Sequence, residues 1–237
     1  MIKTVIFDIG NVLTSFSWQK HFYSFGYPAD IAERLGKATV LSPQWCEYDL
    51  GNLSDDEILE LFIKNDPEIE AVAVETDEIY LTKYALLAAK AGKHIHMEKP
   101  GGADLAEFEE LIQTMKQTGK VFHTGYMYRY NPAVKKCFEL IELGELGEIY
   151  SINAEMSTFH SPEYKNWLRN FNGGIMYILG SHLIDLVVYI LGEPQRVEHY
   201  LKHTGLDEID VEDNNLVVFE YEKALARIYI SSVEVNG

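Results

Sequence analysis

AVAVETDEIYLTKYALLAAKAGKHIHMEKP, residues 71–100, is the stretch that decides the fold of this chain. Its first five residues are an apolar, valine-rich run, and His94–Met97 is a second short run with the character of a strand. Between them, residues 79–91 are rich in apolar helix formers and end at Gly92, a common helix terminator. A strand, a helix and another strand in this order predict a right-handed βαβ unit of a parallel sheet.

The same alternation continues for one more unit and then changes. Leu105–Thr118 is expected to be a helix ended by Gly119, and Val121–Thr124 the next parallel strand. From Pro132 the later strands alternate polar and apolar residues, which predicts an open antiparallel sheet with one solvated face. The elements expected in this part are helices at 132–143 and 174–191 and strands at 147–156, 196–202, 214–221 and 224–232. The last strand ends close to Gly237, so we expect the sheet to be cut short.

The residues before position 71 follow a different pattern. Residues 3–8 form a β-branched run that ends at Asp8, which predicts a buried parallel strand followed by a tight turn at Gly10. Residues 17–62 predict several short helices, one of them opened by a capping box at Ser54–Glu57. We expect strand 3–8 to pair in parallel with strand 71–75, so that the Asp8–Gly10 turn lies in the cleft beside Lys99.

Composition narrows the class of protein. With 37 acidic and 20 basic residues the formal net charge is −17, which argues against nucleic acid or an anionic membrane as a partner. No signal peptide is expected, and the apolar stretch 175–191 is interrupted by Gly180 and Asp185, so it predicts a buried helix rather than a membrane span. Cys46 and Cys137 lack CxxC spacing and are expected to be buried thiols in a reducing compartment. A cytoplasmic location is therefore predicted, and no metal site is.

The first segment resembles a known hydrolase family. Residues 7–13, FDIGNVL, are similar to the first motif of the haloacid dehalogenase superfamily, and residues 45–51 with the following helix look like its helical cap. The resemblance covers residues 1–69 and implies that Asp8 stands at the position of a nucleophile toward phosphate, working with Mg²⁺. Gly10 replaces the usual second acid, and the family's later motifs do not follow. The alternative is that Asp8 is a polar residue at the end of a buried strand.

The second segment resembles an oxidoreductase family. Residues 85–100 close with Glu98-Lys99-Pro100, residues 125–132 read GYMYRYNP, and residues 173–185 read GGIMYILGSHLID. These three ordered motifs are similar to those of the glucose–fructose oxidoreductase and inositol dehydrogenase (Gfo/Idh/MocA) family, over roughly residues 66–237. The resemblance implies a partial Rossmann-like parallel sheet with helices, followed by an α+β domain with an open, mainly antiparallel sheet. The predicted segments are therefore 1–69, 70–130 and 131–237, the last of them truncated.

The resemblance also assigns roles to single residues. Lys99 closes a strand at the edge where open α/β sheets bind ligands, and it matches the lysine that contacts the reacting hydroxyl. His182 matches the histidine taken as general acid and base. Asp185 matches a substrate-binding acid, is expected to carry the chemistry together with Lys99 and His182, and, three residues on, shares a helix face with His182. The alternative is that these two form a satisfied His–Asp pair in the core.

Further positions follow from the same motifs. Thr76, Glu98, Lys99 and Pro100 are predicted to face the cofactor. Tyr126, Tyr128 and Arg129 are predicted either to line the substrate cleft or to pack as a hinge. Two departures stand out: Ile178 occupies a place where many members carry an acid, and Glu75–Glu78 replaces a commoner Thr-Pro pair.

The dinucleotide-binding loop of this family is missing from the sequence. No GxGxxG occurs in the 237 residues, and the hydrolase-like segment stands where that loop belongs. The prediction is an NAD- or NADP-dependent oxidoreductase of a sugar, cyclitol or related hydroxylated substrate, impaired by loss of the loop. Two coding sequences joined near Asn65–Glu70 would explain the pattern. The alternatives are a phosphate-ester hydrolase using Asp8, or a non-catalytic chimeric fragment or interaction module. A homo-oligomer formed through the C-terminal sheet is also expected.

Overall fold

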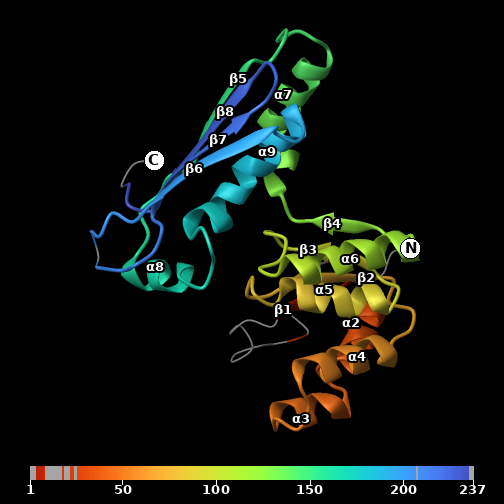
Figure 1. The fold of residues 1–237 in the computed structure, drawn as a ribbon. Coiled ribbons are helices and arrows are strands. Elements are labelled where there is room, and N and C mark those ends of the chain that lie inside the picture. The colour runs from red at the N-terminus through yellow and green to blue at the C-terminus, as the bar shows by residue number, and fades with distance from the viewer. Residues whose placement is uncertain (1–3, 9–17, 19–21, 24–25, 207, 235–237) are drawn as a thin grey trace. The chain divides into compact units, whose positions relative to one another are not determined.

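The computed structural model describes residues 4–8, 18, 22–23, 26–206 and 208–234. The chain divides into two compact units, Met1–Gly125 and Tyr126–Gly237. Each unit is described by itself here, with its elements labelled as in Figure 1. Within the described residues, no helix is both long and apolar enough to cross a membrane.

A parallel sheet forms the centre of the first unit. Its strands are β1 (Thr4–Asp8), β2 (Ala71–Glu75), β3 (His94–Met97) and β4 (Phe122–Thr124), side by side in that order. The register sets Thr4 opposite Ala71 and Asp8 opposite Glu75, which confirms the predicted parallel pairing of the first strand with the second. The turn after Asp8 lies outside the described residues, so its predicted place beside Lys99 stays a prediction.

Helices α5 (Leu81–Lys90) and α6 (Leu105–Thr118) connect these strands and pack against the sheet (Figure 1). Helix α6 has the predicted bounds because both its ends are capped. The Asp104 side chain accepts a hydrogen bond from Glu107 N, and Gly119 adopts a left-handed φ of 65°. Helix α5 begins two residues later than expected, since a turn in which Tyr80 N donates to Asp77 O precedes it.

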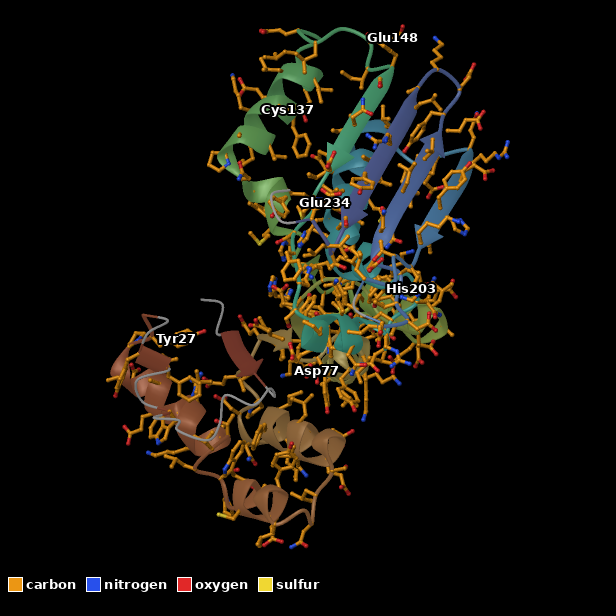
Figure 2. The ribbon with its side chains drawn as sticks, turned by 90° about the vertical axis from the view of Figure 1, so that its left-hand side faces the viewer. Tyr27, Asp77, Cys137, Glu148, His203 and Glu234 are labelled. Carbon is orange, nitrogen blue, oxygen red and sulfur yellow. The ribbon has the colours of Figure 1, made fainter. Side chains whose placement is uncertain are left out.

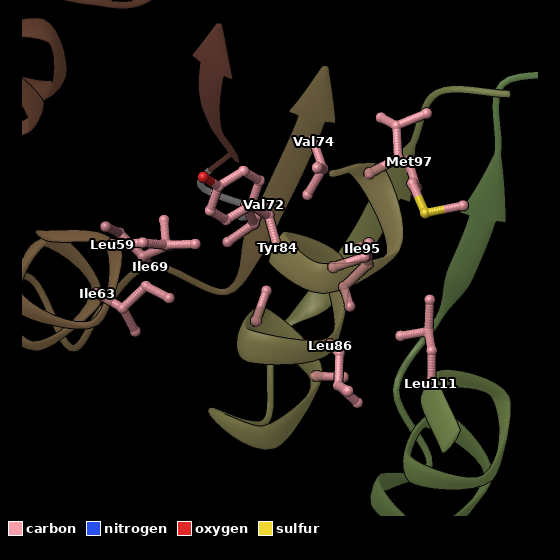
Figure 3. Packing of buried hydrophobic residues seen from close by; sticks show 14 of the residues in the cluster. Leu59, Ile63, Ile69, Val72, Val74, Tyr84, Leu86, Ile95, Met97 and Leu111 are labelled. Carbon is pink, nitrogen blue, oxygen red and sulfur yellow. The ribbon is translucent and has the colours of Figure 1, made fainter. Parts of the chain in front are cut away.

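Three further helices belong to the same unit: α2 (Ala29–Ala38), α3 (Pro43–Asp49) and α4 (Asp55–Asn65). The predicted capping box is present, because Ser54 Oγ accepts from Glu57 N while Ser54 N donates to Glu57 Oε2. Figure 3 shows Leu59 and Ile63 of α4 beside Ile69, in one cluster with Val72 of β2 and Tyr84 of α5. The helical segment and the βαβ segment therefore share one hydrophobic core.

The second unit is built on a mixed sheet. Its strands are β5 (Ser151–Glu155), β6 (Arg196–Lys202), β7 (Asn214–Glu220) and β8 (Leu225–Ser231), in the order β5-β8-β7-β6. Strand β5 is parallel to β8, and the other two pairings are antiparallel. The fold class predicted from the sequence is thereby confirmed for both units: a partial parallel sheet with helices, then an open, mainly antiparallel sheet.

One face of this second sheet carries the core. Val217, Phe219, Ala226, Ile228 and Ile230 alternate along β7 and β8 and pack with the helical segment that precedes β6. That segment was expected to be one helix over 174–191, but it is divided into η3 (Met176–Gly180), a π-helical turn, and α9 (Ser181–Leu191). The unit also contains η2 (Met127–Tyr130), α7 (Pro132–Glu142) and α8 (Pro162–Leu168).

Two sequence predictions need correction. Cys46 on α3 and Cys137 on α7 are both exposed, not buried, because each lies on the outer side of an amphipathic surface helix (Figure 2 labels Cys137). The strand expected from residue 147 begins only at Ser151, since Gly147 adopts a left-handed φ of 67° and ends a turn that Gly144 starts.

Candidate active site

Lys99 lies directly beyond the carboxyl end of β3. The two residues before it are bonded to the neighbouring strands on both sides of β3. Glu98 N donates to Val74 O, in β2, at 2.9 Å, and Gly125 N, just after β4, donates to Met97 O at 2.8 Å. These bonds fix the edge of the sheet at the point where the lysine leaves it. Lys99 therefore stands at the carboxyl edge of a parallel sheet, the edge at which such sheets bind ligands.

The charge of Lys99 is set by burial and by two carboxylates. Burial lowers the pKa of the Lys99 amine, and the negative charges of Glu78 and Glu98 oppose that shift. Burial likewise raises the pKa of the Glu78 carboxyl, and the positive charge of Lys99 counteracts it. Glu78, which in the sequence is only a departure from the family pattern, thus interacts electrostatically with the lysine. An amine with a lowered pKa gives up its proton more readily than an ordinary lysine.

The Glu98 carboxylate lies close to the backbone of Gly125, the residue that follows β4. A Cβ atom on Gly125 would lie 2.7 Å from Glu98 Oε1, so only glycine leaves room for this carboxylate where it stands. Lys99 N also donates to Glu98 Oε2 at 3.3 Å. Pro100 is buried, and Thr76 is half-buried just past the end of β2. Since β2 and β3 are neighbouring parallel strands, all four residues predicted to face the cofactor gather at one edge of the sheet.

These residues fit one end of a dinucleotide. The edge offers a hydroxyl, a partly buried amine and a carboxylate, which suits the polar nicotinamide end. The phosphate end normally requires a glycine-rich turn and a helix N-terminus, and the sequence has no GxGxxG with which to build one. The described residues thus fit the nicotinamide end of the group and supply no recognised cradle for its phosphates. They also contain no set of three or more His, Cys, Asp or Glu arranged to hold a metal ion.

A second group of predicted site residues gathers in the other unit, around the start of α9. His182 is 6% exposed and has tyrosine rings on two sides. The ring of Tyr128 lies 4.9 Å from the imidazole at 85°, and the ring of Tyr126 lies 6.0 Å away at 86°. Both contacts are edge-to-face, the geometry that aromatic rings prefer. The two tyrosines thus fix the plane of the histidine, which is compatible with lining a cleft and with packing a hinge.

Arg129 and Asp185 form a two-pronged ion pair. Arg129 Nε donates to Asp185 Oδ2 at 2.7 Å, and Nη2 donates to Oδ1 at 2.5 Å. The side chain of Asp185 is 8% exposed and that of Arg129 is 39% exposed. The hydrogen bond to Asp185 raises the pKa of Arg129 above its usual range, and the guanidinium also lies 4.7 Å from the ring of Tyr189. Asp185 is therefore bound to an arginine 56 residues away, which the sequence does not indicate.

A π-helical turn positions His182. The turn η3 ends at Gly180, and α9 follows at once, so the histidine lies at the junction between two helical geometries. A Cβ at Gly180 would lie 2.3 Å from Met176 Sδ, so any larger residue there requires the Met176 side chain to move. Ile178, which replaces the acid of many relatives, is 3% exposed and belongs to the apolar core. Turns of this kind are frequent at functional sites.

The predicted residues therefore form two groups, one in each unit. Thr76, Glu98, Lys99 and Pro100 lie together at the sheet edge, joined by Glu78. Tyr126, Tyr128, Arg129, His182 and Asp185 lie together around α9. The catalytic and binding roles assigned to these residues stay predictions.

Comparison with known protein families identifies both units. The model of the oxidoreductase family with an NAD-binding Rossmann fold matches residues 42–126. The model of the GFO/IDH/MocA C-terminal domain matches residues 134–237. The first match begins well before residue 66 and runs through the predicted junction at 65–70. The resemblance to a haloacid dehalogenase, and a fusion near residue 66, gain no support from these matches.

Individual relatives agree with the family matches. The uncharacterized oxidoreductase ORF334 of Rhizobium meliloti is 33% identical over 146 residues, which are 61% of this chain and 42% of that protein. The scyllo-inositol 2-dehydrogenase (NADP(+)) IolW of Bacillus subtilis (strain 168) is 28% identical over 179 residues, 74% of this chain and 49% of that protein. The solved levoglucosan dehydrogenase, in complex with NADH and levoglucosan, is 25% identical with a TM-score of 0.65, over 73% of this chain and 50% of that one. The chain spans about half the length of the curated relatives it matches.

Proposed function

We propose that this chain, which belongs to the GFO/IDH/MocA family of oxidoreductases, acts in nicotinamide-dependent oxidation or reduction of a small hydroxylated substrate. The observation that carries the proposal is the position of Lys99. It is a partly buried amine with a lowered pKa at the carboxyl edge of a sheet that matches an NAD-binding Rossmann fold. Perturbed pKa values cluster at functional sites, which favours a proton-transfer role for this lysine.

The roles of the residues follow from their chemistry. A bound nicotinamide supplies the acceptor or donor of hydride. Lys99 contacts the hydroxyl whose carbon is oxidised, and its lowered pKa favours taking up the hydroxyl proton as the carbonyl forms. His182, fixed by Tyr126 and Tyr128, is the second acid–base group.

The ion pair between Arg129 and Asp185 changes which of the two residues we expect to contact the substrate. Arg129 is the exposed member and Asp185 the buried one, so we assign substrate contact to Arg129 and positioning to Asp185. A guanidinium held in one orientation donates to hydroxyl or carbonyl oxygens of a bound molecule. Relatives named for scyllo-inositol and levoglucosan favour a cyclic polyol or sugar as the class of substrate for this chain.

Dinucleotide binding is proposed to be weak. Thr76, Glu98, Lys99 and Pro100 contact the nicotinamide end, and no glycine-rich turn in the sequence holds the phosphates. Losing an anion site of this type removes a large part of the binding free energy without removing the reacting end of the site. NAD and NADP are both candidates, because the residue that discriminates them normally follows the missing turn.

The test is an activity screen with matched variants. The full chain is incubated with inositols, levoglucosan and common sugars, with NAD⁺ or NADP⁺, and the absorbance of the reduced nicotinamide is followed. We expect slow turnover of at least one cyclic polyol, reduced about 10²- to 10⁴-fold in Lys99→Met and in His182→Ala. Lys120→Met, at an exposed lysine between α6 and β4, is the control and should leave turnover unchanged. Turnover that survives in Lys99→Met contradicts the assignment.

The hydrolase alternative has no such support. The family models match oxidoreductase domains in both units, and residues 9 and 10, which follow Asp8, lie outside the described residues. A Mg²⁺-dependent phosphatase activity that disappears in Asp8→Asn would be the outcome that favours it.

The open face of the second sheet is proposed to form a homo-oligomer. Tyr200 of β6 lies opposite Leu216 of β7, which lies opposite Tyr229 of β8, so these three side chains share the face turned away from the core. Tyr200 is 54% exposed, and Leu216 is half-buried. An apolar row across an uncovered sheet face is a surface that a second copy of the chain would bury.

A further inference from the structure

Two histidines face each other across neighbouring strands of the first unit. His96 of β3 lies opposite His123 of β4 in the register of the sheet. Their Nδ1 atoms are 2.7 Å apart, and their ring centres are 4.9 Å apart with 20° between the ring planes. Stacked ring faces stay about 3.5 Å or more apart, so the two rings meet edge to edge, nitrogen toward nitrogen. The two Nδ1 atoms therefore point at one place between the strands.

This histidine pair lies on the face of the sheet that is turned away from the hydrophobic core. Ile95 and Met97, which flank His96 in the sequence, point into the core, as Figure 3 shows. Because side chains alternate along a strand, His96 points the other way, and its side chain is 43% exposed. His123 is half-buried. An ion from solvent can therefore reach the two rings without disturbing the core.

A carboxylate stands at the other ring nitrogen of His96. Glu98 Oε1 lies 3.7 Å from His96 Nε2, and its negative charge favours a proton on that nitrogen, which leaves the lone pair on Nδ1. Histidines that bind metal ions usually turn their second ring nitrogen toward a carboxylate or a carbonyl in this way. His94, two residues earlier on β3, differs because its Nδ1 already accepts from Val121 N at 3.0 Å. His96 therefore has the surroundings of a metal ligand.

We propose that His96 Nδ1 and His123 Nδ1 together bind one divalent transition-metal ion of the class of Zn²⁺, Ni²⁺ and Cu²⁺. Imidazole nitrogen suits these ions, whereas Mg²⁺ and Ca²⁺ prefer oxygen ligands. Without metal, the proton between the rings belongs to His123 when His96 carries its own on Nε2. On metal binding the His123 proton moves to Nε2 of that ring, so both Nδ1 lone pairs point at the ion and no proton is lost.

The geometry asks for a small opening of the pair. Two nitrogens at about 2.0–2.1 Å from a tetrahedral ion are about 3.3 Å apart, so the rings separate by about 0.6 Å. In the part of the chain that the structure describes, no third His, Cys, Asp or Glu completes a three-ligand set, so water fills the remaining positions. Two protein ligands give a modest affinity, with a Kd of about 1–100 μM. The bound ion would join β3 to β4 three residues before Lys99.

The test is a metal titration of the full chain without an affinity tag. Zn²⁺ and Ni²⁺ are added separately in a non-chelating buffer, and binding is followed by calorimetry and by the rise in melting temperature. We expect one saturable site in the range of Kd given above, weakened at least tenfold in His96→Gln and in His123→Gln because a ligand is lost. Glu98→Gln should weaken binding by up to about tenfold, the lower end for residues that orient a metal ligand, because this contact is long and partly exposed.

His199→Gln is the matched control, because His199 is an exposed histidine of β6 in the second unit. This variant should bind the metal as tightly as the unmodified chain. The proposal is overturned if neither ion saturates a site. It is also overturned if His96→Gln or His123→Gln, with an unchanged melting temperature in metal-free buffer, binds as tightly as the unmodified chain, since the two rings would then share a hydrogen bond only. None of these measurements depends on nicotinamide binding or on turnover.

Discussion

Replacing Arg129 should destabilise the second unit more than replacing Asp185, because the two charges of this ion pair differ in burial. The carboxylate is 8% exposed and the guanidinium 39% exposed, and two charge-assisted hydrogen bonds join them at 2.7 and 2.5 Å. Arg129→Gln leaves a carboxylate buried without its cation. Asp185→Asn leaves a guanidinium that still reaches solvent and still lies over the ring of Tyr189.

The magnitudes follow from that difference. Leaving a buried charge without its partner costs about 3–5 kcal/mol, and an exposed pair is worth about 0–1 kcal/mol. Arg129→Gln should therefore destabilise the second unit by about 3 kcal/mol, with the partial exposure of the pair taken into account. Asp185→Asn should cost about 1–2 kcal/mol, mostly the lost charge-assisted bonding. The double variant should cost less than Arg129→Gln alone, because no buried charge remains.

The assay must report on the second unit alone, since a chain with two compact units need not unfold in one step. Hydrogen exchange of peptides from residues 176–191, measured across a urea series, gives the local free energy of unfolding around His182. The reasoning is refuted if Asp185→Asn costs as much as Arg129→Gln, or if the double variant equals the sum of the two.

Three other expectations concern other parts of the chain. The Lys99 amine should react with an acylating reagent at lower pH than exposed lysines do, and Glu78→Gln should lower the pKa of Lys99 further by removing a negative charge. Mass spectrometry of the acylated chain across a pH series measures both effects. A pKa of Lys99 that is unchanged or raised in Glu78→Gln contradicts the electrostatic interaction between the two residues. Gly174→Ala should destabilise the second unit by about 2–4 kcal/mol, because a Cβ there lies 2.5 Å from a backbone carbonyl oxygen at a φ of +50°. Gly144→Ala, with a φ of +71° and nothing within 4 Å, should cost only about 1 kcal/mol in the same urea series, and equal costs would contradict the account. Tyr200→Glu should shift the chain toward monomers in light scattering, and an unchanged oligomer would remove the open sheet face as the interface.

The sequence predicts those elements whose ends carry local chemistry. Helix α6 has its predicted bounds because Asp104 caps one end and Gly119 the other. Strand β2 and its pairing with β1 were predicted from short, β-branched apolar runs, which are typical of buried parallel strands. A local signal for α8 also exists, since Ser161 and Pro162 form a usual helix start, although the sequence analysis predicts no element there.

Other features depend on contacts that no local pattern encodes. The π-helical turn before α9 was not predicted, because the apolar periodicity of residues 174–191 reads as one continuous helix. The bond from Arg129 to Asp185 joins residues 56 apart, so a motif match gives both residues and not their pairing. Glu78 is a neighbour of Lys99 only because β2 and β3 place their ends together. The exposure of Cys46 was missed for a related reason, because no composition rule tells which face of a short helix is covered.

A titration with reduced nicotinamide tests the central claim most directly. NADH and NADPH are added separately to the full chain, and the nicotinamide fluorescence is followed at constant ionic strength. We predict saturable binding of one of them with a Kd below about 1 mM, worth at least about 4 kcal/mol, that is weakened in Lys99→Met and unchanged in Lys120→Met. A linear, non-saturating response to both dinucleotides up to about that concentration, or equal binding in the Lys99 variant, contradicts an oxidoreductase site at the edge of this sheet.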